Sequence, residues 1–431
     1  KAASAPQLKK LSLPKMRVID PMKGVSRANY RYWRIRILAG IVMGYALFYL
    51  VRANFSIAMP CLQKMGYTKT QLGDILFFWS SLYGVGKFVN GYFSDRSNAR
   101  YFMTIGLVGA AIFSLLVVWN VGYWSLLIVL LCNSWFQSMG WPPAARMLTH
   151  WFSPTELGTK WALGAASHQI GGAVIMIGGG YLVAHYGWES VFIIPSILCL
   201  GGAILLFTLI RDNPSEEGLP AVEHYKGDHF HDDGDTKPLS HQELWRRVLS
   251  NRLLWIVCFG NLFVYIVRMG VLQWAPMFLS EYKGVQLQMA GWQAGFYEIA
   301  GLFGGVSAGW VSDKLFKGRR GPVATFYMIA LFVAIIVFWK TPAGYRFLDT
   351  ITLFLVGFLV YGPQVLVGVA SADFASKKAV GTANGLAGAF ASFGSALSGA
   401  CVGRLTEAYG WNGGFTFFAV AALCGAFCFS M

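Results

Sequence analysis

Long apolar runs recur along this 431-residue chain, and they constrain its fold more than any other feature. Each has about 18 to 25 residues, enough for a helix to cross a hydrocarbon core of about 30 Å. The runs must be helices, because lipid offers the backbone no hydrogen-bond partner, and they lack the polar–apolar alternation of a membrane β-barrel. We therefore predict an all-α membrane protein with twelve transmembrane helices, at residues 35–59, 70–93, 102–120, 123–148, 159–184, 190–210, 253–280, 288–312, 321–340, 349–371, 381–404 and 413–431.

Composition and charge agree with this class of protein. Hydrophobic residues make up 55% of the chain and charged residues 13%, against about 25% in a typical soluble domain. The net charge of +15 comes largely from the N-terminal arm and from short loops that the twelve-span layout places on one side. This pattern predicts a cytoplasmic N-terminus and needs no nucleic-acid partner; a basic arm that binds anionic lipid is the alternative.

The longest polar stretch separates the first six predicted spans from the last six. We therefore expect a basic cytoplasmic N-terminal arm (1–34), a six-helix half (35–210), a cytoplasmic central loop (211–251) and a second six-helix half (252–431). The loop is acidic and rich in Pro and Gly, so we expect it to be mobile. Histidines cluster in it, but nothing fixes a ligand geometry there, and we expect neither a metal nor a cofactor.

Two motifs occur once in each half. The segment "YLVRANFSIAMP" at 49–60 matches "YIVRMGVLQWAP" at 265–276, with Tyr, Val, Arg and Pro at the same spacing. The segment "GYFSDRSNAR" at 91–100 matches "GWVSDKLFKGRR" at 309–320, each after the second span of its half. Two matches in the same order indicate duplication, and duplicated halves of a transporter share a site near the membrane midplane.

The second motif has the form G-x-x-S-D-[RK] and predicts a short charged loop between two helices. An ordinary positively charged cytoplasmic turn is one interpretation. Because the motif is duplicated, we favour a gating role in both halves. The gating residues that we predict are Asp95, Arg96, Arg100, Asp313 and Lys314.

The twelve-span layout, the central loop and this duplicated motif resemble the major facilitator superfamily. Within it, "GYALFYLVRANFSIAMP", "NLFVYIVRMGVLQWAP" and "VYGPQVLVGVAS" closely resemble the organophosphate:phosphate antiporter family, from about residue 27 to the C-terminus. The segments "RYW", "SDRSNARYFMTIGL" and "GWVSDKLFKGRRGP" are most similar to its hexose-phosphate carrier and sensor branch. The resemblance implies two pseudo-symmetric halves and a multi-pass protein of the bacterial cytoplasmic membrane, with the endoplasmic reticulum as the alternative location.

Arg52 and Arg268 lie deep in the first and seventh predicted spans, where a cation costs about 2.5–3.5 kcal/mol on insertion scales. A purely structural role would pair each with a carboxylate, but Glu298 is the clearest deep acid, so at most one arginine has an obvious partner. We therefore predict an anion site shared by both halves. Guanidinium groups suit phosphate because they donate two parallel hydrogen bonds, and two of them nearly neutralise a phosphomonoester.

Five further side chains are candidates for the phosphate pole. Lys87 in the second span either attracts the anion or extends toward the headgroups. His168 is the only histidine deep in a predicted span; a lone membrane histidine is often a packing residue, but the resemblance marks this position as part of the phosphate site. Tyr45, Tyr49 and Tyr265 precede the arginines on the same helix faces, where they can donate hydroxyl groups or close the cavity.

The residues for the organic end of the substrate are less directly indicated. Polar side chains at suitable depth can bond its hydroxyl groups, or bond neighbouring helices instead. These candidates are Asn133, Gln137, Trp274, Glu298, Tyr361, Gln364 and Asn384. The chain departs from the resembling family at Ala53, where a second base often follows the arginine, so the strength of phosphate binding need not match the family.

Together these features predict a sugar-phosphate:inorganic phosphate antiporter that works by alternating access, with glucose 6-phosphate as the first expected substrate. A glycerol 3-phosphate or phosphoglycerate antiporter is an alternative. A membrane receptor for external hexose phosphate that signals to a partner kinase uses the same site and stays open. We expect a monomer, and we do not expect an enzyme, because the spans show no nucleophile–base pair and no metal set.

Overall fold

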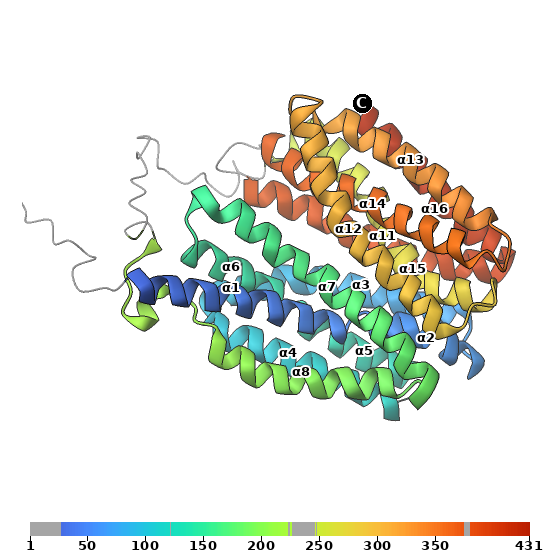
Figure 1. Cartoon of the computed structure of the whole chain (residues 1–431), viewed down its shortest axis with the longest axis horizontal. Helices are drawn as coiled ribbons and strands as arrows, with labels where there is room; N and C mark the ends of the chain where they lie inside the picture. The colour runs from blue at the N-terminus through green and yellow to red at the C-terminus, as the bar shows by residue number, and fades with distance from the viewer. Residues whose placement is uncertain (1–26, 121, 223–224, 226–245, 247, 375–379) are drawn as a thin grey trace, which may run out of the picture.

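The computed structural model describes residues 27–120, 122–222, 225, 246, 248–374 and 380–431, and every regular element in these parts of the chain is helical. Most of the N-terminal arm and of the central loop, including its histidine cluster, lies outside the described residues (Figure 1). The first half contains α1 (Arg27–Leu50), α2 (Asn54–Lys64), α3 (Lys69–Arg96), α4 (Ala99–Leu116), α5 (Tyr123–Gln137), α6 (Trp141–Trp151), α7 (Pro154–Tyr186) and α8 (Ser190–Leu209). The second half contains α11 (Arg252–Glu281), α12 (Leu287–Lys314), α13 (Arg320–Lys340), α14 (Arg346–Phe374), α15 (Val380–Tyr409) and α16 (Trp411–Ser430).

All twelve predicted spans coincide with helices. Among the described residues, eight helices are long and apolar enough to cross a membrane by length and composition. The other four predicted spans correspond to α3, to α5 with α6, to α7 and to α12, which are helical but shorter or less apolar. The predicted all-α membrane fold is therefore confirmed, and its spans differ in length and in mean hydropathy.

Two predicted spans are broken in the middle, which the apolar pattern alone did not show. The fourth span is interrupted between Gln137 and Trp141, where Pro142 and Pro143 can begin a helix but cannot continue one. The first span is interrupted at residues 51–53, between α1 and α2. There the backbone N–H groups of Arg52 and Ala53 both donate to the carbonyl of Tyr49, so the hydrogen-bond ladder tightens for one turn.

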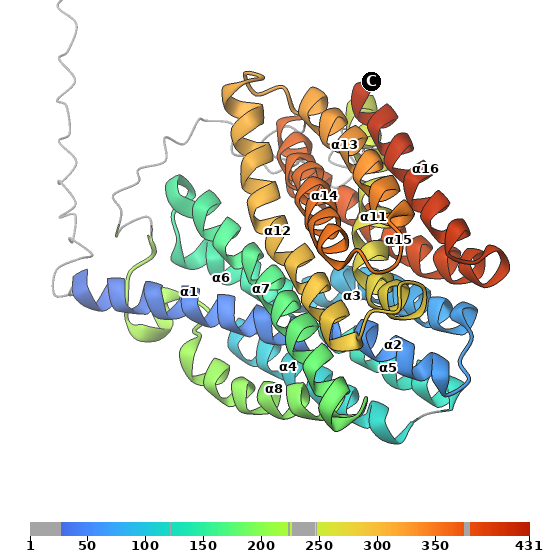
Figure 2. The same ribbon diagram turned by 45° about the vertical axis from the view of Figure 1, so that its right-hand side comes forward.

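The two halves lie side by side and meet along three pairs of helices (Figures 1 and 2). Helix α7 packs against α12, α3 packs against α15, and α2 packs against α11. Helices α7 and α12 diverge toward the end of the molecule where α7 begins and α12 ends. Side chains of the helices that face the other half therefore border the space between the halves.

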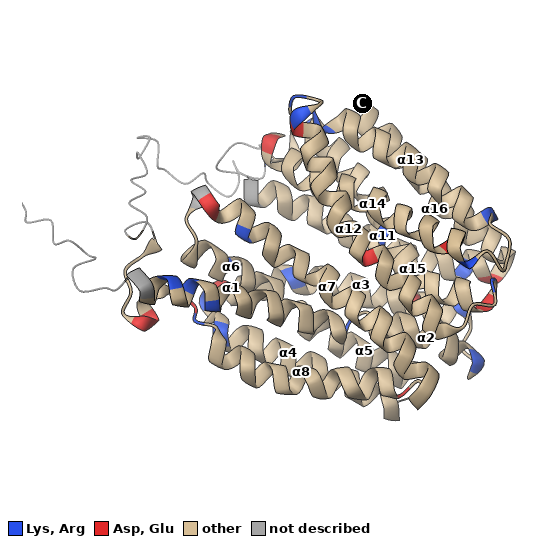
Figure 3. Ribbon diagram, viewed as in Figure 1, with Lys and Arg blue, Asp and Glu red and all other residues tan. Residues whose placement is uncertain are grey.

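At the opposite end, polar side chains join the halves. Lys69 Nζ lies 2.6 Å from Glu281 Oε1, and the backbone N–H of Lys69 donates to Glu407 Oε2 over 2.8 Å. Arg404 Nη2 lies 2.7 Å from Asp74 Oδ1. We call this the closed end, and Figure 3 shows basic and acidic residues gathered there.

Glycines let the helix backbones approach at the closed end. A Cβ atom added to Gly73 of α3 would lie 2.5 Å from the carbonyl oxygen of Gly399 on α15. A Cβ atom added to Gly291 of α12 would lie 2.4 Å from the carbonyl oxygen of Met176 on α7. Because the nearest atoms are backbone, a side-chain rotation cannot relieve either contact.

The chain that follows α11 is fixed by a fully buried ion pair. Lys283 pairs with Asp349 near the start of α14, and its Nζ also donates to the carbonyl of Phe338 over 2.7 Å. Both side chains are almost completely buried. Glu281 lies two residues before Lys283, so this buried ion pair also helps to position Glu281 for its contact with Lys69 at the closed end.

The first part of the central loop contacts the six-helix half that precedes it. Residues 211–222 run along the first half and include a short 3₁₀ turn, Pro214–Glu217. Tyr30 of α1 donates from its hydroxyl to the carbonyl of Pro220 over 3.1 Å, and its ring stacks on Tyr225 at 4.0 Å. The composition predicted mobility for residues 211–251, and that expectation stays a prediction; in the described part, aromatic and backbone contacts join the loop to the first half.

Candidate functional site

A cavity of ≈ 250 Å³ lies between the two halves, and we call it the main cavity. Side chains from α1, α3, α6, α7, α11, α14 and α15 line it. All seven residues predicted for the phosphate pole are among them: Arg52, Arg268, His168, Lys87, Tyr45, Tyr49 and Tyr265. Its described lining contains three permanent cations and no carboxylate, so the cavity favours an anion.

Arg52 lies two residues after the end of α1, in the turn that interrupts the first span, and aromatic rings surround it. Its guanidinium carbon lies 4.2 Å from the ring centre of Tyr83, 4.8 Å from Trp79 and 4.9 Å from Tyr49. Such rings attract a cation through their faces without neutralising it. Within the described chain, Arg52 forms no ion pair, so its charge is available to a ligand.

Arg268 is held differently, in the middle of the unbroken helix α11. It is 3% exposed, and its Nη2 donates to the hydroxyl of Tyr361 over 3.1 Å. That hydroxyl donates in turn to Glu298 Oε2 over 2.6 Å. The tyrosine therefore links Arg268 to the deep acid that the sequence suggested as its partner, but no direct ion pair between Arg268 and Glu298 forms among the described residues.

His168 and Lys87 approach the main cavity from α7 and α3. The Nδ1 atom of His168 bonds to the carbonyl of Ala165, which can only accept, so Nδ1 must carry a proton. Its Nε2 atom is buried and has no hydrogen-bond partner among the described residues. The Nζ atom of Lys87 lies 4.7 Å from the ring centre of Tyr83. Arg52 contacts the same ring, so Tyr83 lies next to both cations.

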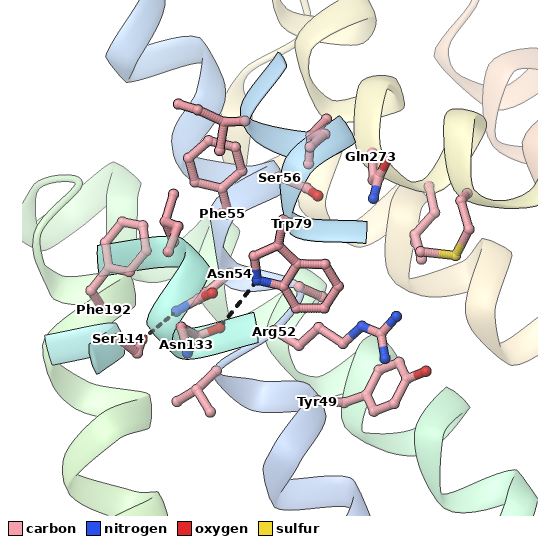
Figure 4. Close-up of a pocket in the computed structure, with 17 residues that line it drawn as sticks. Tyr49, Arg52, Asn54, Phe55, Ser56, Trp79, Ser114, Asn133, Phe192 and Gln273 are labelled. Atoms are coloured by element: carbon pink, nitrogen blue, oxygen red, sulfur yellow. Dashed lines mark hydrogen bonds between the residues drawn. The ribbon is translucent and has the colours of Figure 1, made fainter. Parts of the chain in front are cut away.

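A smaller space of ≈ 40 Å³, which we call the annex, adjoins the main cavity (Figure 4). Tyr49, Arg52 and Met269 line both spaces. Polar side chains of the annex include Asn133, whose Oδ1 accepts from Trp79 Nε1 over 3.3 Å and whose Nδ2 donates to a backbone carbonyl over 2.8 Å. Asn133 therefore orients Trp79 beside Arg52, with both ends of its amide already bonded.

The residues predicted for the organic end of the substrate lie in different places: some at the main cavity, one at the annex and others at neither. Gln364 lines the main cavity, and Glu298 and Tyr361 are linked to it through Arg268. Asn133 lines the annex. The structure does not bring Gln137, Trp274 or Asn384 to either space: Gln137 donates to the carbonyl of Phe48, Trp274 lies in an aromatic cluster, and Asn384 is exposed on α15.

The predicted gating motifs are helix ends rather than loops. Asp95 and Arg96 lie in the last turn of α3, and Asp313 and Lys314 in the last turn of α12. Asp313 pairs with Arg320 at the start of α13. Arg96 donates to the carbonyl of Tyr92, one turn earlier, over 3.3 Å. Polar residues of the motif continue each helix beyond its apolar part. The spans predicted from hydropathy therefore end at residues 93 and 312, before the ends of α3 and α12.

Arg100, the last of the predicted gating residues, belongs to α4, and its side chain contacts α8. Its Nε donates to the carbonyl of Phe207 over 2.6 Å, and its guanidinium carbon lies 3.8 Å from the ring centre of that residue.

Several residues of the site were missed in the sequence. Tyr83, Ser80, Trp141 and Ser395 line the main cavity, and the hydroxyl oxygens of Ser80 and Ser395 lie 3.1 Å apart across the halves. Tyr83 precedes Lys87 by four residues, and this spacing places both on one face of α3. That signal was available, whereas the approach of Ser80 to Ser395 depends on how the halves pack.

Comparison with known proteins agrees with this fold. The model of the Major Facilitator Superfamily matches residues 41–370. The chain is 41% identical over 400 residues to the Glycerol-3-phosphate transporter of Bacillus subtilis (strain 168), covering 90% of this chain and 89% of that protein. It is 39% identical over 422 residues to the "Probable hexose phosphate transport protein" of Chlamydia pneumoniae, covering 93% and 91%.

A third relative is the Membrane sensor protein UhpC of Escherichia coli (strain K12), 37% identical over 399 residues and covering 92% of this chain and 91% of that protein. Among solved structures, a bacterial homolog of the human lysosomal transporter Spinster, in an inward-facing and occupied conformation, superposes with a TM-score of 0.75. It covers 92% of this chain and 96% of its own at 15% identity, so it supports the fold alone.

The chain therefore belongs to the major facilitator superfamily, in the branch of the organophosphate:phosphate antiporters. This membership makes it a multi-pass membrane protein among transporters rather than enzymes.

Proposed function

We propose that this chain exchanges a small phosphorylated compound for inorganic phosphate by alternating access, and that Arg52 and Arg268 bind the phosphate group. One observation carries the proposal. The two arginines come from corresponding motifs of the two halves, and both face a single cavity whose described lining holds no carboxylate.

The chemistry of the main cavity suits a phosphomonoester. Such a group carries a charge of about −1.5 to −2 near pH 7 and offers three acceptor oxygens. Arg52 and Arg268 supply planar donors, and Lys87 adds a point charge. His168 can contribute through Nε2 in either of two ways: it donates if the ring is protonated, and it accepts if the phosphate retains a proton. A monocarboxylate would leave more of this positive charge uncompensated.

The same charges favour exchange over one-way transport. Two unit charges about 10 Å apart repel by about 1.7 kcal/mol at an effective dielectric of about 20. Enclosing them without an anion adds a desolvation cost of several kcal/mol per ion. The empty protein should therefore change conformation slowly. A phosphate group bound during each conformational change should lower this barrier, because it neutralises the two cations.

The proposed location is the bacterial cytoplasmic membrane, with the N-terminus and central loop in the cytoplasm. The closed end, where Lys69 meets Glu281 and Glu407, would then face outward. We propose a monomer, since each polypeptide supplies both halves of the cavity. Hexose phosphate and glycerol 3-phosphate are both proposed substrates, because the names of two relatives point to one each.

Reconstitution in proteoliposomes tests the proposal. Vesicles loaded with inorganic phosphate should take up labelled phosphate rapidly, and vesicles without internal phosphate should take it up far more slowly. Unlabelled glucose 6-phosphate, glycerol 3-phosphate and phosphoglycerate, added in turn outside, should rank as competitors in the order of their affinity. Equal uptake by loaded and unloaded vesicles would contradict exchange.

A membrane receptor for external hexose phosphate is a second candidate, supported by the sensor name of one relative. The phosphate site would be the same, so binding does not separate the two functions. A receptor should bind labelled glucose 6-phosphate in purified form while phosphate-loaded vesicles show no exchange. A partner kinase co-purifying with the protein would strengthen that result.

A further inference from the structure

Three arginines meet at the C-terminal end of α8, and none of them lines the main cavity or the annex. Arg36 of α1 donates from Nη2 to the carbonyl of Thr208 over 2.5 Å. Arg211, two residues after the end of α8, donates from Nη1 to the same carbonyl over 3.2 Å. Arg100 of α4 donates to the carbonyl of Phe207, one residue earlier. We call these three residues the arginine cluster, and Figure 3 shows basic residues gathered at this end of the first half.

Two arginines of the cluster have no anionic partner. Arg211 pairs with Glu217, and its Nε lies 2.5 Å from Oε1. Arg36 and Arg100 form no ion pair among the residues that the structure describes. The dipole of α8 places only about half a negative charge at this end, so it cannot balance two cations. The cluster therefore attracts more negative charge than the helix supplies.

The acids that lie nearest to the cluster in the sequence bind other groups. Asp212 Oδ2 lies 2.9 Å from Arg146 Nη2. Glu216 accepts from the side-chain amide of Asn98 and from the backbone N–H of Asp212. Neither acid forms an ion pair with the cluster, so its two unpaired arginines are not neutralised directly by this described segment.

Both unpaired arginines keep hydrogen-bond donors for a ligand. The two terminal nitrogens of Arg100 have no partner in the described chain, and neither is closed off from the surface. Arg36 uses one N–H of each terminal nitrogen, on Tyr32 and on Thr208, and each nitrogen carries a second. Guanidinium groups with free donors of this kind bind the oxygens of a phosphate group in pairs.

The cluster lies where three apolar spans end together. The span formed by α1 and α2, helix α4 and helix α8 are each long and apolar enough to cross a membrane. The rings of Tyr32 and Tyr101, next to the cluster, are more than half exposed, as aromatic side chains are at a membrane–water interface. One turn farther into the spans, Ile105 of α4 and Ile204 of α8 are exposed as well. Apolar side chains that face outward therefore adjoin the cluster.

We propose that the arginine cluster binds the phosphate group of an anionic phospholipid, whose acyl chains lie along the exposed apolar side chains of α4 and α8. The phosphodiester of such a lipid supplies the negative charge that Arg36 and Arg100 lack. The position of the cluster at the end of three spans favours a lipid over a free phosphate ion, because only the lipid also covers the apolar surface. This site is separate from the main cavity, so the inference does not depend on the proposed function.

Native mass spectrometry of the purified, delipidated full chain tests the inference by measuring the affinity for the first bound lipid. The protein is titrated with phosphatidylglycerol and with phosphatidylcholine, whose quaternary amine cancels the phosphate charge. A basic residue near an anionic lipid contributes about fivefold in affinity, so two unpaired arginines should favour phosphatidylglycerol by about 25-fold. Arg36→Gln and Arg100→Gln should each lower this preference about fivefold, since glutamine can still donate to the α8 carbonyl but has no charge. Arg36→Lys combined with Arg100→Lys keeps both charges and should retain most of the preference.

A matched control comes from α11. Arg252 is also an exposed arginine at the end of an apolar span and has no ion pair among the described residues. Arg252→Gln should leave the preference for phosphatidylglycerol unchanged. Equal affinity of wild-type protein for the two lipids, a preference that survives Arg36→Gln combined with Arg100→Gln, or an equal loss in Arg252→Gln would overturn the inference. Release of phosphatidylglycerol by inorganic phosphate, but not by chloride at the same ionic strength, would also overturn it by showing that the cluster takes a free anion.

Discussion

The close approach of α3 and α15 at the closed end offers a way to shift the protein between conformations with a single methyl group. In Gly73→Ala the new Cβ would lie 2.5 Å from the carbonyl oxygen of Gly399, whereas ordinary contacts begin at 3.4 Å. It would also lie 3.1 Å from the Cα atom of Gly403. The two helices must therefore separate by about 0.9 Å locally. Overpacking of this kind costs about 1–3 kcal/mol, and the cost falls only on the conformation in which this end is closed.

This cost corresponds to a shift of about 5- to 150-fold in the equilibrium between conformations. Spin labels at Lys64 and Tyr409, which are exposed in opposite halves at the closed end, report the separation by pulsed electron paramagnetic resonance. We expect the distance distribution in Gly73→Ala to move toward longer values. A second pair at Phe93 and Leu315, near the ends of α3 and α12, should move toward shorter values if the halves rock as rigid bodies.

Gly178→Ala on α7 is the matched control, because a Cβ at that position meets nothing within 4 Å. Gly291→Ala tests the second glycine contact, where the Cβ would lie 2.4 Å from the carbonyl oxygen of Met176, and it should act in the same direction as Gly73→Ala. Label distances that stay at wild-type values in both test variants would show that these glycines do not set the conformational balance.

Three further predictions concern the buried charges. Arg52→Lys and Arg268→Lys should each weaken phosphate binding by about 10- to 100-fold in calorimetry, because an ammonium group cannot reproduce the paired donors; near-normal affinity in both would remove the two-arginine site. Tyr361→Phe should lower the free energy of unfolding in detergent by about 1–3 kcal/mol, since it leaves Glu298 Oε2 buried without its donor, and an unchanged melting temperature would contradict this. Asp349→Leu should cost about 3–5 kcal/mol by leaving Lys283 buried and unpaired, and adding Lys283→Met should recover most of the loss; a double variant no more stable than the single one would refute the pairing.

Much of the fold could be predicted because the membrane simplifies the problem. Apolar runs of sufficient length must be helices, so each of the twelve predicted spans is helical, two of them as a pair of helices with a break between them. Helix ends were less predictable: Asp95 and Asp313 are polar yet continue α3 and α12, because a helix that leaves the lipid no longer needs apolar residues. The break at residues 51–53 has no proline or glycine to indicate it.

That the deep cations would meet in one cavity was predictable for a different reason. A charge in a membrane span is costly, so Arg52, Lys87 and Arg268 stand out in the sequence, and duplication brings the two arginines to a common cavity. Neutral polar residues carry no such signal. Gln137 and Gln364 looked equivalent, but one bonds the carbonyl of Phe48 and the other lines the cavity. Which neutral side chain faces the ligand depends on helix rotation, and apolar composition does not fix that rotation.

The structure also shows that the duplicated arginines are not equivalent. Arg268 belongs to a continuous helix and shares the hydroxyl of Tyr361 with a buried acid, so part of its hydrogen-bonding capacity is already used. Arg52 follows a broken helix, is surrounded by aromatic rings, and adjoins both the main cavity and the annex. A ligand that binds Arg268 meets a guanidinium that already donates to Tyr361 and lies near the buried acid Glu298, whereas Arg52 has aromatic and hydroxyl neighbours and no carboxylate partner among the described residues. On the proposed function, the first half would therefore attract the anion first, and engagement of Arg268 from the second half would couple binding to movement of the halves.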